Sequence, residues 1–393
     1  MNLTGLSPAH RDSLQRGALA VGLIASVLSI GGAFFNSPQF FRSYLLAYLF
    51  WIGLPLGCFA IVMLHHLVGG TWGFVIQRLL ESGIRTFPLM ALLFLPLLFG
   101  MPEIYPWARP EIVAADPILQ QKSLYLNLPF FVARAVMYFA IWIGVGHFLD
   151  SWSLEQDRTA DGSLTGRLQN LSGPGLVLYG LTVTFSVIDW IMSLEPRWYS
   201  TIYGMIFIVS YGLAALAFVI GAAFLLAGEK PLAQVIAPSH FHDLGNLLLA
   251  LVMFWAYMAF SQFLLVWVEN LRDEIPWYLH RTTGGWEFIA LALILFQFTL
   301  PFVLLLSRVT KRRAGLLSVV ALVILFMHWV DLLWFVAPAF HPERFHIHWL
   351  DVSISAGIGG VWLSAFLFYL KHRSLLPLHD PRFANVMEQE QET

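Results

Sequence analysis

Charged residues and cysteine are both scarce in this chain. Only 12% of its 393 residues are Asp, Glu, Lys or Arg, and Cys58 is the single cysteine. One thiol excludes an internal disulfide, an iron–sulfur cluster ligated by this chain alone and a CxxCH haem attachment. A net charge of −2 gives no electrostatic reason to expect a nucleic-acid partner. Any redox centre is therefore expected to bind without a covalent link or to belong to a partner.

Histidine pairs suited to haem are missing as well. His65, His66 and His147 lie near one side of the predicted membrane spans, and only His328 lies deeper. A single deep histidine cannot supply both axial ligands of a bis-histidine haem, and we predict no metal site. Amide side chains within the spans are expected to form hydrogen bonds between helices: Asn246, Gln262 and Gln297.

Apolar residues, in contrast, make up 58% of the chain, and the mean hydropathy is +0.71. A soluble domain needs a polar outer shell and cannot hide so much apolar surface. Crossing about 30 Å of hydrocarbon takes about 20 apolar residues, and helices satisfy their own backbone there. The sequence therefore predicts an all-α integral membrane protein with about ten transmembrane helices: 17–35, 43–64, 86–104, 128–149, 173–193, 201–227, 243–268, 284–307, 314–338 and 350–370.

The connections and their charges predict how the chain is oriented. Lys and Arg are about twice as frequent on the side of the two termini as on the opposite, outer side, which predicts that both termini are cytoplasmic. The run 17–35 is interpreted as a retained first span rather than a cleaved signal. The two longest predicted loops, 105–127 and 150–172, contain most of the loop acids and are expected to contact a partner.

Two titratable side chains lie deep in one predicted span. His328 and Asp331 are one helical turn apart and therefore share a helix face. An ionisable residue in hydrocarbon is costly enough to indicate a function, and an adjacent acid tunes the protonation of an imidazole. The pair predicts a proton relay. A hydrogen-bonded core histidine is the alternative that the sequence leaves open.

A basic and an acidic residue also occur near the outer ends of the fourth and fifth predicted spans. Arg134 and Asp189 lie at similar depth, and neighbouring spans would bring them together as an ion pair. A structural salt bridge and a role in proton or quinol chemistry both stay open for this pair. Glu195 follows Asp189 about two turns later, at the interface.

Further candidates for a proton path lie nearer to the ends of the spans. His147 and Asp150 have the same spacing as His328 and Asp331, at the terminal side of the fourth span, and Glu269 and Glu287 lie at the outer side. Proton transfer needs titratable groups within hydrogen-bond reach of one another. These residues would extend the path toward both faces, although each is also typical of an interfacial position.

Three sequence blocks resemble a known family. They are SYLLAYLFWIGLPLGCFAIVMLHHLVGGTWG from Ser43, FSVIDWIMSLEPRWYSTIYG from Phe185 and FWAYMAFSQFLLVWVENLRDEIPWYLHRTTGGW from Phe254. The blocks are similar to the NrfD/polysulfide-reductase-like membrane subunits of alternative complex III, a bacterial quinol:cytochrome c oxidoreductase. The resemblance extends over essentially the whole chain.

The resemblance implies a fold, a location and partners. It implies an N-terminal segment with one peripheral helix (1–42), two four-helix bundles (43–200 and 201–338), and a second peripheral helix with a cytoplasmic tail (339–393). The location would be the bacterial inner membrane. The partners would be membrane lipids, a sister subunit of the same fold, a periplasmic iron–sulfur protein and c-type cytochromes. Haem and iron–sulfur clusters would be held by those partners only.

In this family the quinol pocket lies at the outer mouth of the first bundle, so menaquinone or ubiquinone is the ligand implied. The outer half of that bundle has no histidine here, which leaves Asp189 as the proton acceptor that quinol oxidation needs. This departure favours the sister subunit as the quinol site. The positions that match the mouth are Tyr44, Tyr48, Arg134, Tyr138 and Asp189.

A second quinone site of this chain at the outer mouth, around Asp189 and Arg134, stays open, and so do three further functions. The first, which we favour, is a subunit that supports quinol oxidation and provides a transmembrane proton path. The second is a passive structural anchor of the complex, with the buried acids merely paired. The third is a stand-alone transporter, in which Pro55, Pro96 and Pro301 would interrupt spans as in known carriers.

Overall fold

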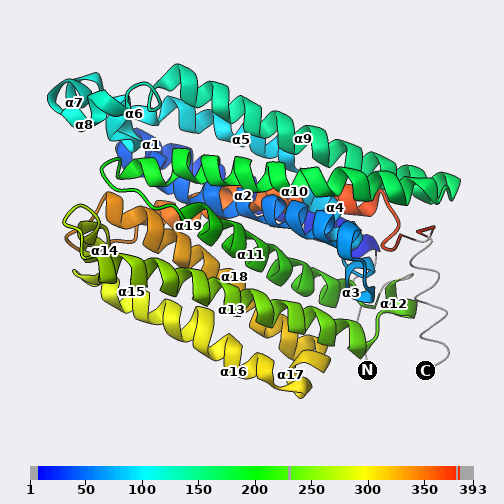
Figure 1. Ribbon diagram of the computed structural model, residues 1–393. Helices are drawn as coiled ribbons and strands as arrows, with labels where there is room; N and C mark the ends of the chain where they lie inside the picture. The colour runs from blue at the N-terminus through cyan, green and yellow to red at the C-terminus, as the bar shows by residue number, and fades with distance from the viewer. Residues whose placement is uncertain (1–7, 229–231, 378, 381–393) are drawn as a thin grey trace.

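The computed structural model describes residues 8–228, 232–377 and 379–380. Within these ranges the chain forms helices and no β-strand, and ten helices are long and apolar enough to span a membrane. Figure 1 shows these helices running side by side, with short helices at both ends. The predicted all-α membrane class is confirmed, and the chain is a multi-pass helical membrane protein.

The spanning helices overlap all of the predicted segments. Some of them are composite: the third combines α4 and α5, and the eighth combines α15, the π-helix η3 and α16. In chain order they are α1 (Pro8–Phe35), α2 (Ser37–Val68), α4 (Gln77–Ile84) with α5 (Phe87–Phe99), α9 (Leu128–Thr159), α10 (Ser163–Trp190), α11 (Tyr203–Leu226), α13 (Pro238–Glu269), α15 (Trp286–Ala292) with η3 (Leu293–Thr299) and α16 (Leu300–Leu306), α18 (Ala314–Val336) and α19 (Trp349–Lys371).

Short helices define the two ends of the bundle (Figure 1). The terminal end is the end where α1 begins and α19 ends; there Asp12 and Lys371 form an ion pair with an O–N distance of 3.4 Å. It carries α3 (Thr71–Phe74), α12 (Leu232–Val235) and α17 (Arg308–Arg312). The loop end is the opposite end and carries α6 (Met101–Ile104), η1 (Pro106–Ala108), α7 (Pro110–Ala115), α8 (Pro117–Lys122), η2 (Met192–Leu194), α14 (Ile275–Thr282) and η4 (Ala337–Ala339).

One predicted loop is wrong. The segment 150–172 is almost entirely helical, because α9 continues to Thr159 and α10 starts at Ser163. The third span likewise starts at Gln77 rather than at residue 86. Hydropathy places the end of a span where polar residues begin, but a helix continues past that point when its charged side chains find partners or water. The tail beyond residue 380 lies outside the described residues.

Helix α2 lies at the centre of the molecule and is almost fully buried. It packs against α4, α5, α10, α11 and α19, whereas α11 packs against α13 and α18. The helices thus group as α2, α4–α5, α9 and α10 beside α11, α13, α15–α16 and α18, with α1 and α19 paired alongside α2. This grouping agrees with two bundles and two outer helices. The exact domain boundaries stay a prediction.

Glycine permits the closest helix crossings. An added Cβ at Gly22 of α1 would lie 2.7 Å from the backbone N of Val361 in α19, and Gly360 faces Gly22 just as closely. In the core, Gly57 of α2 lies against the backbone of Tyr211 in α11. Close backbone approach through small residues is a main source of helix association in membranes.

Candidate functional site

His328 lies inside the protein, between the two helix groups. Its side chain is 1% exposed and packs between the rings of Phe50 in α2 and Tyr211 in α11, with ring centroids 5.8 and 6.0 Å away. Neither ring nitrogen has a hydrogen-bond partner among the described residues. Since buried polar groups nearly always find a partner, this imidazole is an exception that needs an explanation.

Asp331 follows one turn later on α18 and is 2% exposed. Its Oδ2 accepts hydrogen bonds from Nε1 of Trp255 in α13, at 3.2 Å, and from the hydroxyl of Ser210 in α11, at 3.4 Å. No lysine, arginine or histidine in the described part of the chain lies within ion-pair distance of it. No hydrogen bond joins Asp331 to His328 among the described residues, because Asp331 faces α13 whereas His328 faces α2.

The predicted ion pair of Arg134 and Asp189 is present near the loop end, between α9 and α10. Nε and Nη2 of Arg134 donate to the two carboxylate oxygens of Asp189, both at 2.8 Å. Tyr138 adds a third hydrogen bond to the same carboxylate, also at 2.8 Å. The guanidinium stacks over Tyr125, 3.9 Å from the ring centroid, and donates to its carbonyl. Both oxygens of Asp189 are therefore held by donors inside the protein.

The residues proposed to line a quinone pocket fall into two places. Arg134, Tyr138 and Asp189 meet as described, whereas Tyr44 and Tyr48 of α2 donate their hydroxyls to backbone carbonyls of α5 at 2.8 and 3.1 Å. All five side chains are buried. They line neither the small polar cavity at the loop end nor the apolar groove described below. Their hydrogen-bonding groups bind one another or backbone carbonyls.

The remaining proton-path candidates lie mostly at the surface. His147 is exposed on α9, while Asp150 is buried and binds arginines. Glu269 and Glu287 are both exposed at the loop end, and Glu287 accepts a hydrogen bond from the backbone N of Gly285 at 2.7 Å. The structure therefore does not bring His147 and Asp150 together, and neither glutamate lies inside the protein.

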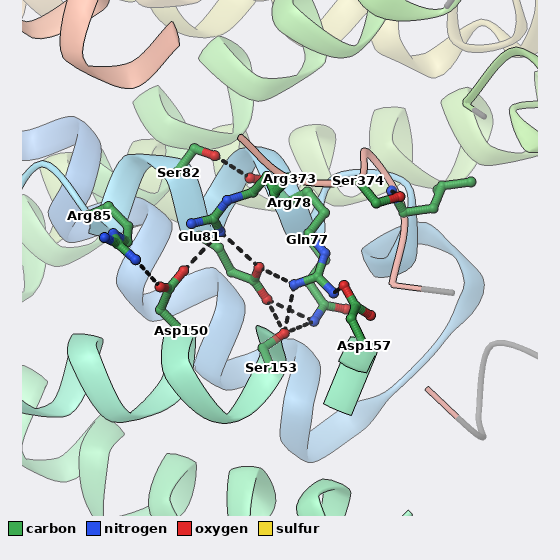
Figure 2. Close-up of polar contacts among 11 residues, drawn as sticks. Gln77, Arg78, Glu81, Ser82, Arg85, Asp150, Ser153, Asp157, Arg373 and Ser374 are labelled. Atoms are coloured by element: carbon green, nitrogen blue, oxygen red, sulfur yellow. Dashed lines mark hydrogen bonds and ion pairs between the residues drawn. The ribbon is translucent and has the colours of Figure 1, made fainter. Parts of the chain in front are cut away.

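A cluster of charged side chains lies at the terminal end, where α4, α9 and the segment after α19 meet (Figure 2). We call it the terminal cluster. At its centre, Glu81 accepts from Arg78 at 2.5 Å, from Ser153 at 2.6 Å and from Arg373 at 3.2 Å. Its members are three arginines and three acids: Arg78, Arg85, Arg373, Glu81, Asp150 and Asp157.

Arg373 connects the end of the chain to this cluster. It contacts both Glu81 on α4 and Asp150 on α9, the latter at 2.8 Å, and is 4% exposed. Asp150 also binds Arg85, at 2.7 Å. The sequence predicts that these arginines lie in loops, and the cluster was not predicted. The Arg–Glu spacing of Arg78 and Glu81 is a local signal, whereas the contact of Arg373 is with residues far away in the sequence.

A second charged cluster joins the helix groups at the loop end. Glu195, just after η2, binds Arg281 of α14 at 2.6 Å and His280 at 3.2 Å. Burial raises the pKa of Glu195, but Arg281 and His280 outweigh it and hold the pKa below the usual range. Arg281 also donates to the carbonyl of Phe335 in α18. This contact fixes α14 against α18.

A small cavity at the loop end is lined by polar residues that sequence analysis did not single out. Arg42, His341, His346 and Asp351 line it together with apolar side chains. The rings of His341 and His346 lie 4.7 Å apart, and Asp351 accepts from the hydroxyl of Ser43 at 2.5 Å. Burial, His346 and Arg42 lower the pKa of His341. A sequence feature that could have identified this cavity is the presence of three histidines within eight residues of the loop.

The predicted role of the amide side chains is partly right. Asn246 of α13 accepts from Lys311 of α17 at 2.7 Å, and Gln262 binds Ser200. Gln297 has no hydrogen-bond partner among the described residues although it is fully buried. It lies in the π-helix η3, which precedes Pro301. Proline has no N–H for the carbonyl four residues earlier, and π-helical turns often occur at functional sites.

The comparisons with known proteins add no family. No family model matches the chain, and no curated protein matches it. Within the described residues, no group of three or more His, Cys, Asp or Glu side chains is placed to hold a metal ion. The class that the fold defines is therefore a polytopic α-helical membrane protein with buried titratable groups.

Proposed function

We propose that this chain is a membrane subunit of a bacterial quinol-oxidising respiratory complex of the alternative complex III type. In that complex it supports quinol oxidation and provides a transmembrane proton path. The similarity of its sequence blocks to NrfD-like subunits supports the family, and the ten spanning helices support the membrane location. The proposed orientation places the terminal end in the cytoplasm, following the excess of Lys and Arg there.

The observation that carries the proton path is the environment of Asp331. This carboxyl is buried at membrane depth with two hydrogen-bond donors and no cation among the described residues. A carboxyl of this kind binds and releases a proton without breaking an ion pair. Asp189 differs, because Arg134 and Tyr138 hold both of its oxygens. We therefore assign the proton-transfer role to Asp331 with His328, and a structural role to Asp189.

The proposed division of labour places the quinol site elsewhere. The candidate pocket residues of this chain bond to one another or to backbone, which favours the sister subunit as the place of quinol oxidation. Haem and iron–sulfur clusters would then belong to the periplasmic partners. This chain would then contribute to turnover in two ways: it binds the other subunits at its loop end, and it transfers protons.

A passive anchor is the second candidate, and one observation favours it. Closed ion-pair clusters lie at both ends of the bundle: the terminal cluster and the group of Glu195 with Arg281. Such clusters fix helices in position and need no chemistry. Asp331 is the residue that distinguishes the two candidates, since in an anchor its carboxyl would only join α18 to α11 and α13 by hydrogen bonds, whereas in a proton path it would also bind and release a proton.

Purification from native membranes tests the assignment to a complex. The chain is tagged in its own host, solubilised in a mild detergent and isolated by affinity and size-exclusion chromatography. We expect co-elution with haem-stained c-type cytochromes and with an iron–sulfur protein, and quinol:cytochrome c activity in the same fractions. A colourless, isolated chain would contradict the proposal and favour a transporter.

A further inference from the structure

A deep apolar groove follows the terminal half of the molecule, between the α1–α19 pair and the α11–α18 pair. Its volume is about 770 Å³, within the range of small-molecule sites. Arg11, Gly315 and Leu370 line it at the terminal end, and Val21 and Leu325 line it at the inner end. The groove is independent of the residues assigned above to proton transfer.

The length of the groove matches one leaflet of a bilayer. Ten residues of α18 separate Gly315 from Leu325, which corresponds to about 15 Å of helix. Half of the hydrocarbon thickness is also about 15 Å. Just beyond Leu325 the groove ends where α18 meets α19, because Nε1 of Trp329 donates to the hydroxyl of Ser355 at 3.0 Å. A transmembrane helix of a partner is twice as long and does not fit a groove that is closed at mid-depth.

The charged residue of the lining lies where a lipid headgroup would lie. Arg11 lines the groove at the terminal end. About one turn further in, Ser318 is also among the lining residues, but its side chain is only 4% exposed and its hydroxyl oxygen is buried. The rest of the lining is almost entirely apolar. The order from the end inward is therefore a cation and then mainly hydrocarbon.

We infer that this groove holds one anionic phospholipid of the leaflet at the terminal end. Arg11 binds its phosphate, and an acyl chain fills the groove as far as Leu325. The isoprenoid tail of a quinone matches the apolar part but has no phosphate for Arg11. If the terminal end is cytoplasmic, as proposed, the adjoining leaflet is the one rich in anionic lipid.

Filling the groove tests the inference without disturbing the helix contacts. A Cβ added at Gly17 or at Gly221 meets no atom within 4 Å, so Gly17→Leu and Gly221→Leu place a side chain in the open groove. Gly144 and Gly180 have equally open surroundings but do not line the groove, and Gly144→Leu and Gly180→Leu serve as matched controls. Native mass spectrometry of the full chain in detergent, with phosphatidylglycerol as the added probe, measures binding.

We expect the unaltered chain and both controls to retain phosphatidylglycerol, and the two groove variants to lose it. Arg11→Gln tests the headgroup; it should weaken phosphatidylglycerol binding about five-fold relative to phosphatidylcholine. Arg16→Gln, at an exposed position of the same helix outside the groove, should change nothing. Equal retention by the groove variants and the controls, or a quinone as the retained molecule, would overturn the inference.

Discussion

Arg134 of α9 and Asp189 of α10 meet side by side, with both guanidinium–carboxylate distances at 2.8 Å and both side chains buried. A two-point contact of this kind is the strongest geometry for an arginine–carboxylate pair. Removing one partner leaves an uncompensated charge inside the membrane protein. The stability lost in this way is much larger than the net stabilisation that the intact pair provides.

Arg134→Gln should therefore destabilise the protein by about 3–5 kcal/mol. Arg197 and Asp116 form a matched pair at the same end with a 2.9 Å distance, but Arg197 is 71% exposed. Arg197→Gln should leave stability almost unchanged, because solvent screens that pair. Thermal unfolding in detergent measures both, and equal losses in the two variants would contradict this account.

Arg373 should hold the chain after α19 against α4 and α9. Charge-assisted hydrogen bonds contribute about 1.5–3 kcal/mol each, so Arg373→Gln should increase opening of this segment about ten-fold or more. Hydrogen exchange or limited proteolysis of residues 374–377 measures the opening. Lys371→Gln is the control, since its ion pair with Asp12 is longer and partly exposed. No difference between the two variants would show that the terminal cluster does not fix this segment.

His341 should make the stability of the loop end depend on pH. Its pKa is lowered by burial, by His346 and by Arg42, and Arg344 acts in the same direction while Asp351 opposes it. The unfolded chain binds a proton near the usual pKa of about 6.5, whereas the folded protein keeps the neutral imidazole. Stability should therefore fall as the pH drops below about 6.5.

The unfolding temperature at pH 7.5 and 5.5 measures this effect. His341→Gln should reduce the difference between the two temperatures. His372→Gln, an exposed histidine at the terminal end, should leave the difference unchanged. If both variants keep the full pH dependence, His341 does not cause it.

The crossing of α1 and α19 should tolerate no side chain at Gly360. A Cβ there would lie 2.5 Å from Cα of Gly22, so Gly360→Ala must move one helix and should destabilise the protein by about 1–3 kcal/mol. Gly31→Ala on α1 meets no atom within 4 Å and should be neutral or slightly stabilising. Chemical denaturation of both variants gives the comparison, and a stable Gly360→Ala protein would contradict the observed packing.

Hydropathy predicted the spanning helices well because each must be apolar over its length to cross the bilayer. It failed at their ends: Arg78 and Glu81 belong to a helix since they neutralise each other there. The Arg134–Asp189 pair followed from matched depth on neighbouring spans. By contrast, the contact of Arg373 with Glu81 depends on how helices distant in sequence pack, and no local pattern encodes it.

The burial of His328 and Asp331 on α18 was predictable, but the direction in which each side chain points was not. Both lie buried on α18, as expected, yet one faces α2 and the other α13. Neighbours across a helix depend on the rotation of that helix against the others, which its own sequence does not specify. The exposed position of His147 has the same origin.

The most direct test of the proposed function is proton movement by the purified complex in liposomes. Proton release per quinol oxidised is compared between the unaltered complex, Asp331→Asn and the exposed control Glu287→Gln. The account predicts that Asp331→Asn abolishes or strongly reduces proton movement while the assembled complex remains intact, and that Glu287→Gln behaves as the unaltered protein. Unchanged proton movement and turnover in Asp331→Asn would contradict the proton path and leave this chain as a structural anchor.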